Sequence, residues 1–203
     1  MALDLTQELK DMAKAYDLTE KEVLQWYRGA VRSMWGNSIF KRKLEADTVK
    51  MVKNTNARSM KRYPMVRRFT CESCGEDYGT SGVELDHKNG ENKLTSYDHV
   101  ENFTKAILFS KPNELQWLCG QQKKTVNKKK VVVASGCHIL KGVAEKNPSL
   151  TEDQVWAKVE VARIKKYDDI GIALKGKGVV DLPKFKKDQE ALLLELLTEE
   201  YQK

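Results

Sequence analysis

Long apolar runs are missing from this sequence, and so is any internal repeat. A membrane-spanning helix needs about 18 consecutive apolar residues, so the chain is expected to have no membrane partner. The first residues lack the positive start and the apolar stretch of a signal peptide. We therefore expect a soluble, intracellular protein that is not secreted, and in a reducing compartment cysteines favour metal binding over disulfides.

Acidic residues are fewer than basic ones, which gives the 203-residue chain a net charge of +7. This balance favours a polyanionic partner, although many basic proteins bind no nucleic acid. The excess is local, because residues 41–68 contain ten Lys or Arg and only two acids, Glu45 and Asp47. A chain of this length can form one domain with a sizeable core, or a small core that carries helical extensions.

Apolar periodicity predicts helices at both ends of the chain. The expected N-terminal helices lie within residues 5–13, 20–34 and 39–52, and Trp26 and Trp35 are interpreted as core residues rather than base-stacking platforms. In the C-terminal part, one helix is predicted after a cap at residues 149–152, and a last helix contains residues 192–197. Residues 171–178 are predicted to be a flexible basic loop. They are not a P-loop, because Gly178 stands where Ser or Thr must hold magnesium.

The middle of the chain has a different pattern. Residues 83–87 alternate apolar and polar side chains like a short strand, and residues 88–91 are turn-forming. A helix is predicted over residues 97–109 and a second strand over 113–119. Another helix is predicted to begin near residue 137. The minimal architecture predicted here is strand, strand, helix.

The four cysteines of the chain form one arrangement, in which Cys71 and Cys74 make a Cys-x-x-Cys pair and Cys119 and Cys137 follow later. Four thiolates with such a pair at the front are what a tetrahedral structural zinc site needs. We therefore predict that all four cysteines bind Zn²⁺.

Candidate catalytic residues lie between and beside these cysteines: Asp86, His87, Asn113 and His138. Hydrolysis of a phosphodiester needs an activated water, neutralisation of the phosphoryl charge and stabilisation of the leaving oxygen. A histidine with a near-neutral pKa can take the proton, and a divalent ion can do the other two jobs. Asp86 is a hard oxygen ligand next to the candidate base His87. His138 is a candidate second ligand, and Asn113 is a candidate for holding His87 in position.

Several motifs, in this order, resemble the HNH nucleases of the ββα-metal type. The likeness covers roughly residues 69–142. It rests on Cys71-x-x-Cys74, Leu85-Asp86-His87, Asn113-Glu-Leu-Gln-Trp-Leu-Cys119 and Cys137-His138-Ile-Leu-Lys141. The resemblance implies an α+β fold with a ββα-metal (HNH) core stapled by the four-cysteine zinc site. The expected parts are a helical basic extension (1–68), the nuclease domain (69–145) and a helical C-terminal extension (146–203).

The resemblance also implies a function, a metal-dependent DNA endonuclease. His87 is implied as the general base, and Asp86 and His138 as ligands of a catalytic Mg²⁺ or Mn²⁺. Asn113 is implied as a positioning residue. The implied partner is double-stranded DNA, cut to 5′-phosphate and 3′-hydroxyl ends by a monomer or homodimer. The spacing is similar to that of free-standing phage and intron-associated, homing-type members. The expected location is therefore the cytoplasm or nucleoid of a bacterial or phage-infected cell.

One departure from the family pattern is an insertion, residues 120–136, where such members close with Cys-x-x-Cys-His. It holds five lysines and no acid. It is either a basic hairpin that reaches DNA or a solvated surface loop. Phosphate contacts dominate the affinity of proteins for DNA, so basic residues are the candidates for binding it. The residues expected to bind DNA are Lys61, Arg62, Arg67, Arg68, Lys123, Lys124, Lys128, Lys129 and Lys130.

Two alternatives stay open at this point. One alternative to the DNA endonuclease is a zinc-stabilised DNA-binding protein without catalysis. The other is a nuclease that acts on RNA or on branched DNA.

Overall fold

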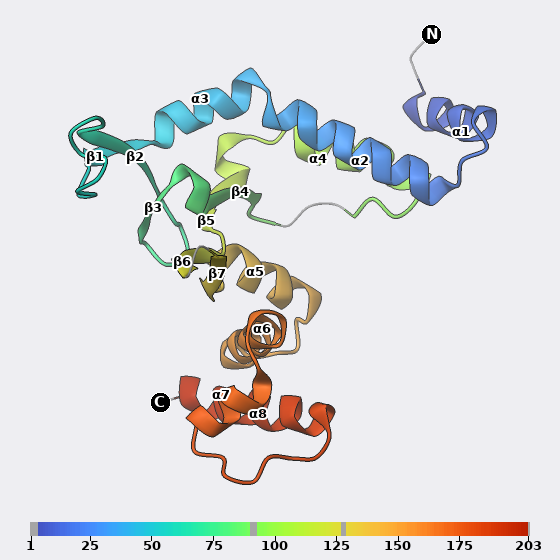
Figure 1. The fold of residues 1–203 in the computed structure, drawn as a ribbon. Coiled ribbons are helices and arrows are strands. Elements are labelled where there is room, and N and C mark those ends of the chain that lie inside the picture. Colours follow the sequence, from blue (N-terminus) through green and yellow to red (C-terminus); the bar gives the residue numbers. More distant parts are fainter. Residues whose placement is uncertain (1–3, 90–92, 127–128, 203) are drawn as a thin grey trace. The chain divides into compact units, whose positions relative to one another are not determined.

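A computed structural model describes residues 4–89, 93–126 and 129–202, and it combines helices with small sheets (Figure 1). Packing divides the chain into two compact units. The first contains residues 1–69 and 85–116, and the second contains residues 70–84 and 117–203. The units group residues by packing, so the sequence-based division by expected function stays a prediction. Within the described ranges, no helix is both long enough and apolar enough to cross a bilayer.

Helices and strands alternate along the chain, and they form three small sheets, β1-β2-β3, β4-β5 and β6-β7. The helices are α1 (Leu5–Ala15), α2 (Glu20–Gly36), α3 (Ile39–Thr48), α4 (Val100–Leu108), α5 (Cys137–Lys146), α6 (Glu152–Tyr167), α7 (Ile170–Gly176) and α8 (Lys186–Tyr201). The strands are β1 (Lys50–Lys53), β2 (Met65–Thr70), β3 (Asp77–Gly79), β4 (Val83–His87), β5 (Leu115–Cys119), β6 (Gln122–Val126) and β7 (Lys129–Ala134). Short 3-10 helices are η1 (Thr80–Gly82), η2 (Tyr97–His99) and η3 (Pro112–Glu114).

The first unit has a core built by α1, α2 and α4, and α2 runs alongside α4 (Figure 1). Thr19 and Glu22 begin α2 with the capping box that the sequence predicts. The phenol of the buried Tyr27 on α2 lies 2.6 Å from the hydroxyl of the half-buried Thr104 on α4, which ties the two helices together. The buried residues of this core are Leu9, Val23, Leu24, Tyr27, Val31, Leu94, Val100, Phe103 and Ile107.

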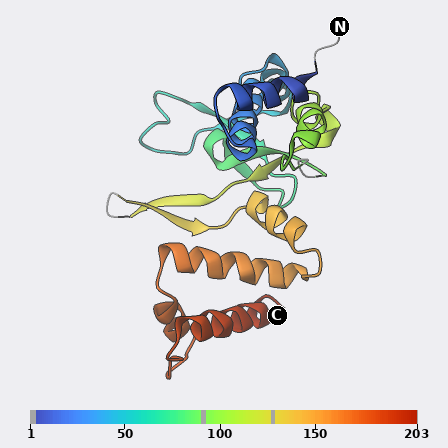
Figure 2. The same cartoon turned by 90° about the vertical axis from the view of Figure 1, so that its right-hand side faces the viewer.

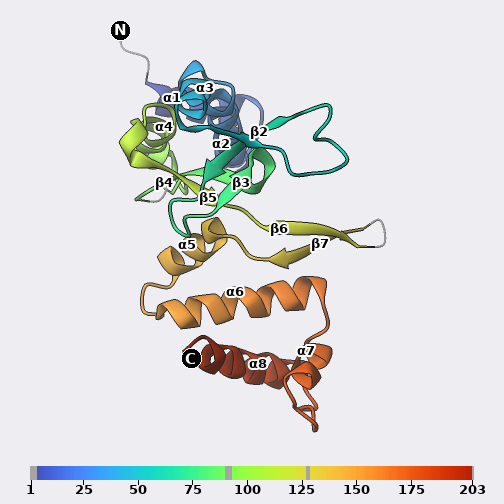
Figure 3. The ribbon, with the colours of Figure 1, turned by 90° about the vertical axis from the view of Figure 1, so that its left-hand side faces the viewer.

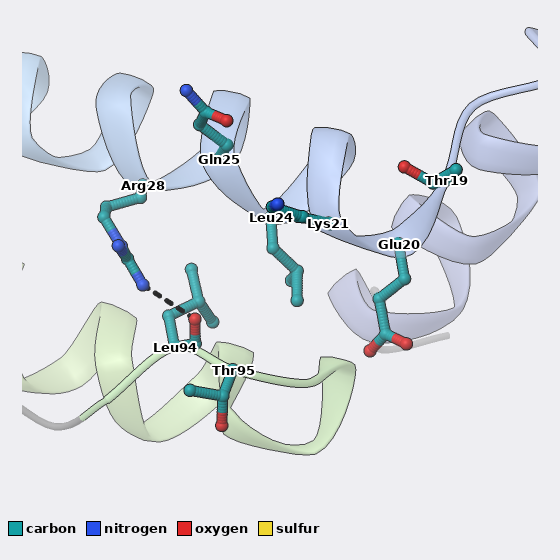
Figure 4. Close-up of a pocket in the computed structure, with 8 residues that line it drawn as sticks. All are labelled: Thr19, Glu20, Lys21, Leu24, Gln25, Arg28, Leu94 and Thr95. Atoms are coloured by element: carbon teal, nitrogen blue, oxygen red, sulfur yellow. Dashed lines mark hydrogen bonds between the residues drawn. The ribbon is translucent and has the colours of Figure 1, made fainter.

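A pocket of about 820 Å³ in this unit separates α2 from the segment that leads to α4 (Figure 4). Arg28 donates a hydrogen bond of 2.7 Å to the Leu94 carbonyl. Glu20 accepts one of 2.8 Å from the backbone N–H of Tyr97. Arg28 and Glu20, two polar residues of the pocket wall, thus hold the segment before α4 against α2, so we interpret the pocket as a structural feature of this contact.

The second unit has a helical core in which α6 and α8 lie side by side (Figure 3). Ala157 and Ile164 of α6 pack there with Leu174 of α7 and with Leu193 and Leu197 of α8.

The β6–β7 hairpin lies on α6 within the same unit (Figure 2). Arg163 of α6 donates a hydrogen bond of 3.2 Å to the Val132 carbonyl of β7. Val132 is itself buried, which gives the hairpin an apolar anchor on the helix. Within the insertion, residues 122–126 and 129–134 therefore pair as two antiparallel strands.

Several sequence-based expectations are confirmed and others are wrong. The strand over residues 83–87 is confirmed. The helix over 97–109 is confirmed as η2 followed by α4. The helix predicted over 39–52 ends at Thr48, because the chain turns there into β1. The predicted loop 171–178 is wrong, since most of it forms α7.

Trp26 was expected in the core, but its side chain is 57% exposed. Its neighbours Val23 and Tyr27 take the buried side of α2 instead. Trp35 packs partly buried against the core of the first unit, as expected.

Candidate functional site

The four cysteines form a cluster in the second unit. Their sulfur atoms all lie within 4.8 Å of one another, which is close enough to hold a metal ion such as zinc. Cys71, Cys119 and Cys137 are buried, whereas Cys74 is exposed. The structure thus brings together residues that are far apart in the sequence, and a set of four thiol ligands fits zinc by its chemistry.

Local backbone geometry at Cys71 and Cys74 forms a tight turn. The Gly75 N–H donates to the Cys71 carbonyl at 2.9 Å, and the Cys71 N–H donates to the Glu76 carbonyl at the same distance. Gly75 has a φ of 75°, a left-handed conformation that glycine adopts without steric strain. The glycine after the Cys-x-x-Cys pair is therefore what lets the chain turn back toward β3.

The two ends of the insertion meet at the cluster. A Cβ atom added to Gly136 would lie 2.1 Å from the Cys119 carbonyl oxygen and 2.2 Å from that of Gly120. Only glycine allows such a close approach of two backbones. Next to this contact, the Cys137 N–H donates to the Cys119 sulfur at 3.2 Å. The insertion therefore leaves and re-enters the structure at one point, and Cys137 takes its expected place in the cluster.

The electrostatics of the cluster favour a bound cation. Burial raises the pKa of the Cys71 thiol, but the backbone N–H groups of Cys74, Cys119 and Ser73 outweigh it and lower that pKa to about 7. Burial and the neighbouring Cys119 thiol raise the pKa of Cys137 to about 12. Burial also raises the pKa of Cys119. Four thiolates so close together would repel one another unless a cation lay between them, and Zn²⁺ would supply two positive charges.

His138, the second residue of α5, has an acidic partner on β4. Its Nδ1 lies 3.1 Å from a carboxylate oxygen of Glu84. A Cβ atom on Gly120 would come within 2.9 Å of the other Glu84 oxygen, so glycine at this position makes room for that side chain. When neutral His138 donates Nδ1–H to Glu84, its Nε2 carries the lone pair. Metal-binding histidines commonly have such a carboxylate partner.

His87, the last residue of β4, lies in the first unit, and its Nε2 is 2.8 Å from the Ser110 hydroxyl. The Ser110 hydroxyl donates its own proton to the Ala106 carbonyl of α4. A hydroxyl has one proton, so Ser110 accepts a hydrogen bond from His87 Nε2–H. The lone pair of the neutral imidazole is then on Nδ1. Nothing in the local sequence pattern marked Ser110 as a partner of His87.

The other expected site residues are placed as follows. Asp86 is half-buried in β4. Asn113 is exposed in η3, and the second strand begins at Leu115 rather than at Asn113. Asp86, His87 and Asn113 belong to the first unit, whereas His138 and the cysteines belong to the second. A shared catalytic site for Asp86, His87 and His138 stays a prediction.

Of the residues expected to bind DNA, those that the structure describes lie on or next to two hairpins. Lys61, Arg62 and Arg67 are exposed on or next to the β1–β2 hairpin, and Arg68 is half-buried. In the insertion, Lys123 is exposed on β6. The backbone of Lys124, Lys129 and Lys130 forms part of the β6–β7 ladder, and Lys128 lies outside the described residues.

Comparisons with protein-family models, with curated proteins and with solved structures gave no match to this chain. The assignment of a function therefore depends on the residues described above and on their chemistry.

Proposed function

We propose that this chain is a zinc-stabilised, metal-dependent DNA endonuclease of the HNH type. The observation that carries the proposal is the cysteine cluster, in which Cys119 ends β5 and Cys137 begins α5. The next residue, His138, is thereby tied to the end of the strand that pairs with β4, and β4 ends in Asp86-His87. Strand, strand and helix thus follow the order of the family motif. Strand β4 carries Asp86 and His87, β5 ends in Cys119, and α5 begins with Cys137 and His138, whereas Asn113 lies in η3 just before β5.

In the proposed mechanism His87 acts as the general base. Ser110 holds His87 Nε2–H, so the lone pair on Nδ1 takes a proton from the attacking water. Asp86 and His138 would hold a Mg²⁺ or Mn²⁺ ion, which when bound stabilises the charge on the leaving 3′ oxygen. Glu84 orients the His138 ring for this task. The products are a 5′-phosphate and a 3′-hydroxyl.

Plasmid nicking in magnesium or manganese tests the proposal. We expect His87→Ala to lower the nicking rate about 100-fold or more, because removal of a general base loses its contribution to proton transfer. The matched control is His99→Ala, since His99 forms local hydrogen bonds to Thr95 and Ser96 and has no proposed catalytic role.

Two outcomes would contradict the proposal. Equal nicking by the wild-type and His87→Ala chains would remove His87 from its role. DNA binding in a gel shift, with no nicked product at any chain concentration, would favour the non-catalytic zinc-stabilised binding protein. Parallel reactions on duplex RNA and on branched DNA identify the substrate class.

A further inference from the structure

The hairpin formed by β1 and β2, with the loop 54–64 between them, combines dense positive charge with an internal network of hydrogen bonds. From Lys50 to Arg68 the chain has seven cations and no acid. Figure 3 shows the loop extending away from the helices of its own unit. A segment with this charge is suited to bind a polyanion, and its internal structure indicates which surface of the hairpin makes the contact.

A buried asparagine organises this loop. Among the residues that the structure describes, Asn54 is the one buried polar residue, with 6% of its surface exposed. Its amide nitrogen donates to the Tyr63 carbonyl at 2.7 Å and to the Ser59 hydroxyl at 3.0 Å. Its amide oxygen accepts from the Asn56 N–H at 3.0 Å. One side chain thus joins both ends of the loop to its middle, so the exposed cations of the loop are carried by a preordered backbone.

The strands of the hairpin present one exposed face. Met51 lies opposite Arg67, and Lys53 lies opposite Met65, so these four side chains point to the same side. All four are exposed. On the other side, the opposed pair Val52 and Val66 is half-buried. The exposed face therefore alternates methionines and cations across β1 and β2, two neighbouring antiparallel strands of the three-stranded sheet β1-β2-β3.

We propose that this β-ribbon lies in the major groove of duplex DNA. The major groove of B-DNA is about 12 Å wide and admits a two-stranded ribbon, whereas the minor groove is about 6 Å wide and does not. Met51 and Met65 then contact base edges such as thymine methyl groups, and Lys53 and Arg67 reach the flanking phosphates. The major groove of duplex RNA is deep and narrow, so the ribbon discriminates against RNA. The inference rests on the proposed function in taking DNA as the partner.

A binding experiment tests the ribbon separately from cleavage. The zinc-loaded His87→Ala chain is titrated into a fluorescent DNA duplex without added magnesium, at several salt concentrations. Replacement of Lys53 and Arg67 by Gln should weaken binding at least about tenfold and reduce the salt slope by about 2, since each phosphate contact contributes about 0.9. The matched control replaces Lys14 and Lys21, two exposed lysines of the same unit, by Gln. It should change neither the affinity nor the salt slope.

A second variant tests the preordered loop at constant charge. Asn54→Ala should weaken binding about threefold or more, because the loop must then be ordered when it binds. Guanine N7 atoms lie in the major groove, so bound wild-type protein should protect them from dimethyl sulfate. Unprotected N7 atoms, or equal affinity for an RNA duplex of the same sequence, would overturn the inference.

The outcomes separate this inference from the proposed function. If the wild-type chain nicks DNA but the ribbon and control variants bind alike, the ribbon inference fails and the endonuclease proposal stands. If only the ribbon variant loses binding and the wild-type chain never nicks DNA, the ribbon inference stands and the endonuclease proposal fails.

Discussion

The Ser110 hydroxyl lies between the His87 ring and the Ala106 carbonyl, and it has one proton to donate. It donates to the Ala106 carbonyl and accepts from His87 Nε2. This arrangement selects the tautomer of His87 that has its lone pair on Nδ1. In the proposed mechanism Ser110 is therefore a positioning residue, because it would act on the reaction only through His87.

We expect Ser110→Ala to lower kcat for nicking about 10-fold to 100-fold, the range found when a partner that orients a metal-binding histidine is removed. KM should not change, because Ser110 touches no substrate in the proposed mechanism. Ser110→Thr keeps the hydroxyl and should restore most of the rate. A loss in Ser110→Thr as large as that in Ser110→Ala would show that size rather than the hydrogen bond matters at this position.

Gly136 lies where two backbone segments come so close together that no side chain fits between them. A Cβ atom there would meet the Cys119 and Gly120 carbonyl oxygens well inside normal contact distance. We expect Gly136→Ala to lower the free energy of unfolding by about 1–3 kcal/mol, since the two ends of the insertion must move apart. Chemical denaturation measures this change, and zinc analysis reports whether the cluster still loads.

The matched control for Gly136 is Gly142 in the middle of α5, where an added Cβ atom meets no neighbour. Gly142→Ala should leave zinc content unchanged and raise stability by about 0.5–1 kcal/mol, because alanine is the better helix former. Equal effects of the two substitutions would contradict the backbone-contact argument.

The role of a residue could be predicted from the sequence where it depends on the spacing of residues along the chain. The four cysteines were found because a Cys-x-x-Cys pair with two later cysteines marks a metal site. Ser110 was not found, because its contact with His87 depends on how α4 ends. Trp26 was misplaced, because its exposure depends on which side of α2 faces the core.

The elements of the chain show which local patterns carry enough information. Apolar periodicity predicted α2 and α6, a leucine-rich stretch predicted α8, and alternation predicted β4. The capping box of α6 is formed by Thr151 and Gln154, two residues later than predicted, because two overlapping motifs compete there. Helix α7 was missed, because its glycines outweighed its N-cap, Asp169.

Helix α7 is held by one fully buried residue, Leu174, which packs between α6 and α8. We expect Leu174→Ala to lower the free energy of unfolding by about 2–5 kcal/mol, the range for removing a buried leucine. Urea denaturation followed by circular dichroism measures the change. The control is Ile172→Ala in the same helix, where the side chain is 72% exposed and the effect should stay within about 0.5 kcal/mol. Similar values for the two variants would show that α7 does not dock.

At the scale of the whole molecule, the cysteine cluster joins two stretches of the second unit that are distant in sequence. Cys71 and Cys74 come from residues 70–84, and Cys119 and Cys137 come from residues 117–203. Residues 70–84 form only short strands, and apart from Cys71 the buried apolar residue described there is Val83. Metal binding is therefore expected to contribute a large part of the stability of this unit.

We expect one zinc per chain, and its removal by a chelator should lower the midpoint of thermal unfolding sharply, since structural zinc contributes on the order of 10 kcal/mol. Zinc binds thiolates, and burial raises the pKa of Cys119 and of Cys137. Binding must therefore release protons from these thiols. Zinc affinity should accordingly fall as the pH is lowered from about 8 to about 6, and competition with a colorimetric chelator measures it.

Cys74→Ser isolates the metal contribution, because Cys74 is exposed and its replacement removes no buried packing. The variant should unfold at a lower temperature than the wild-type chain when zinc is present. After chelation the two chains should unfold at the same temperature, because neither then has a metal to lose. A difference that persists without zinc would mean that Cys74 stabilises the chain in some other way. Equal stability with zinc present would show that Cys74 is not a ligand.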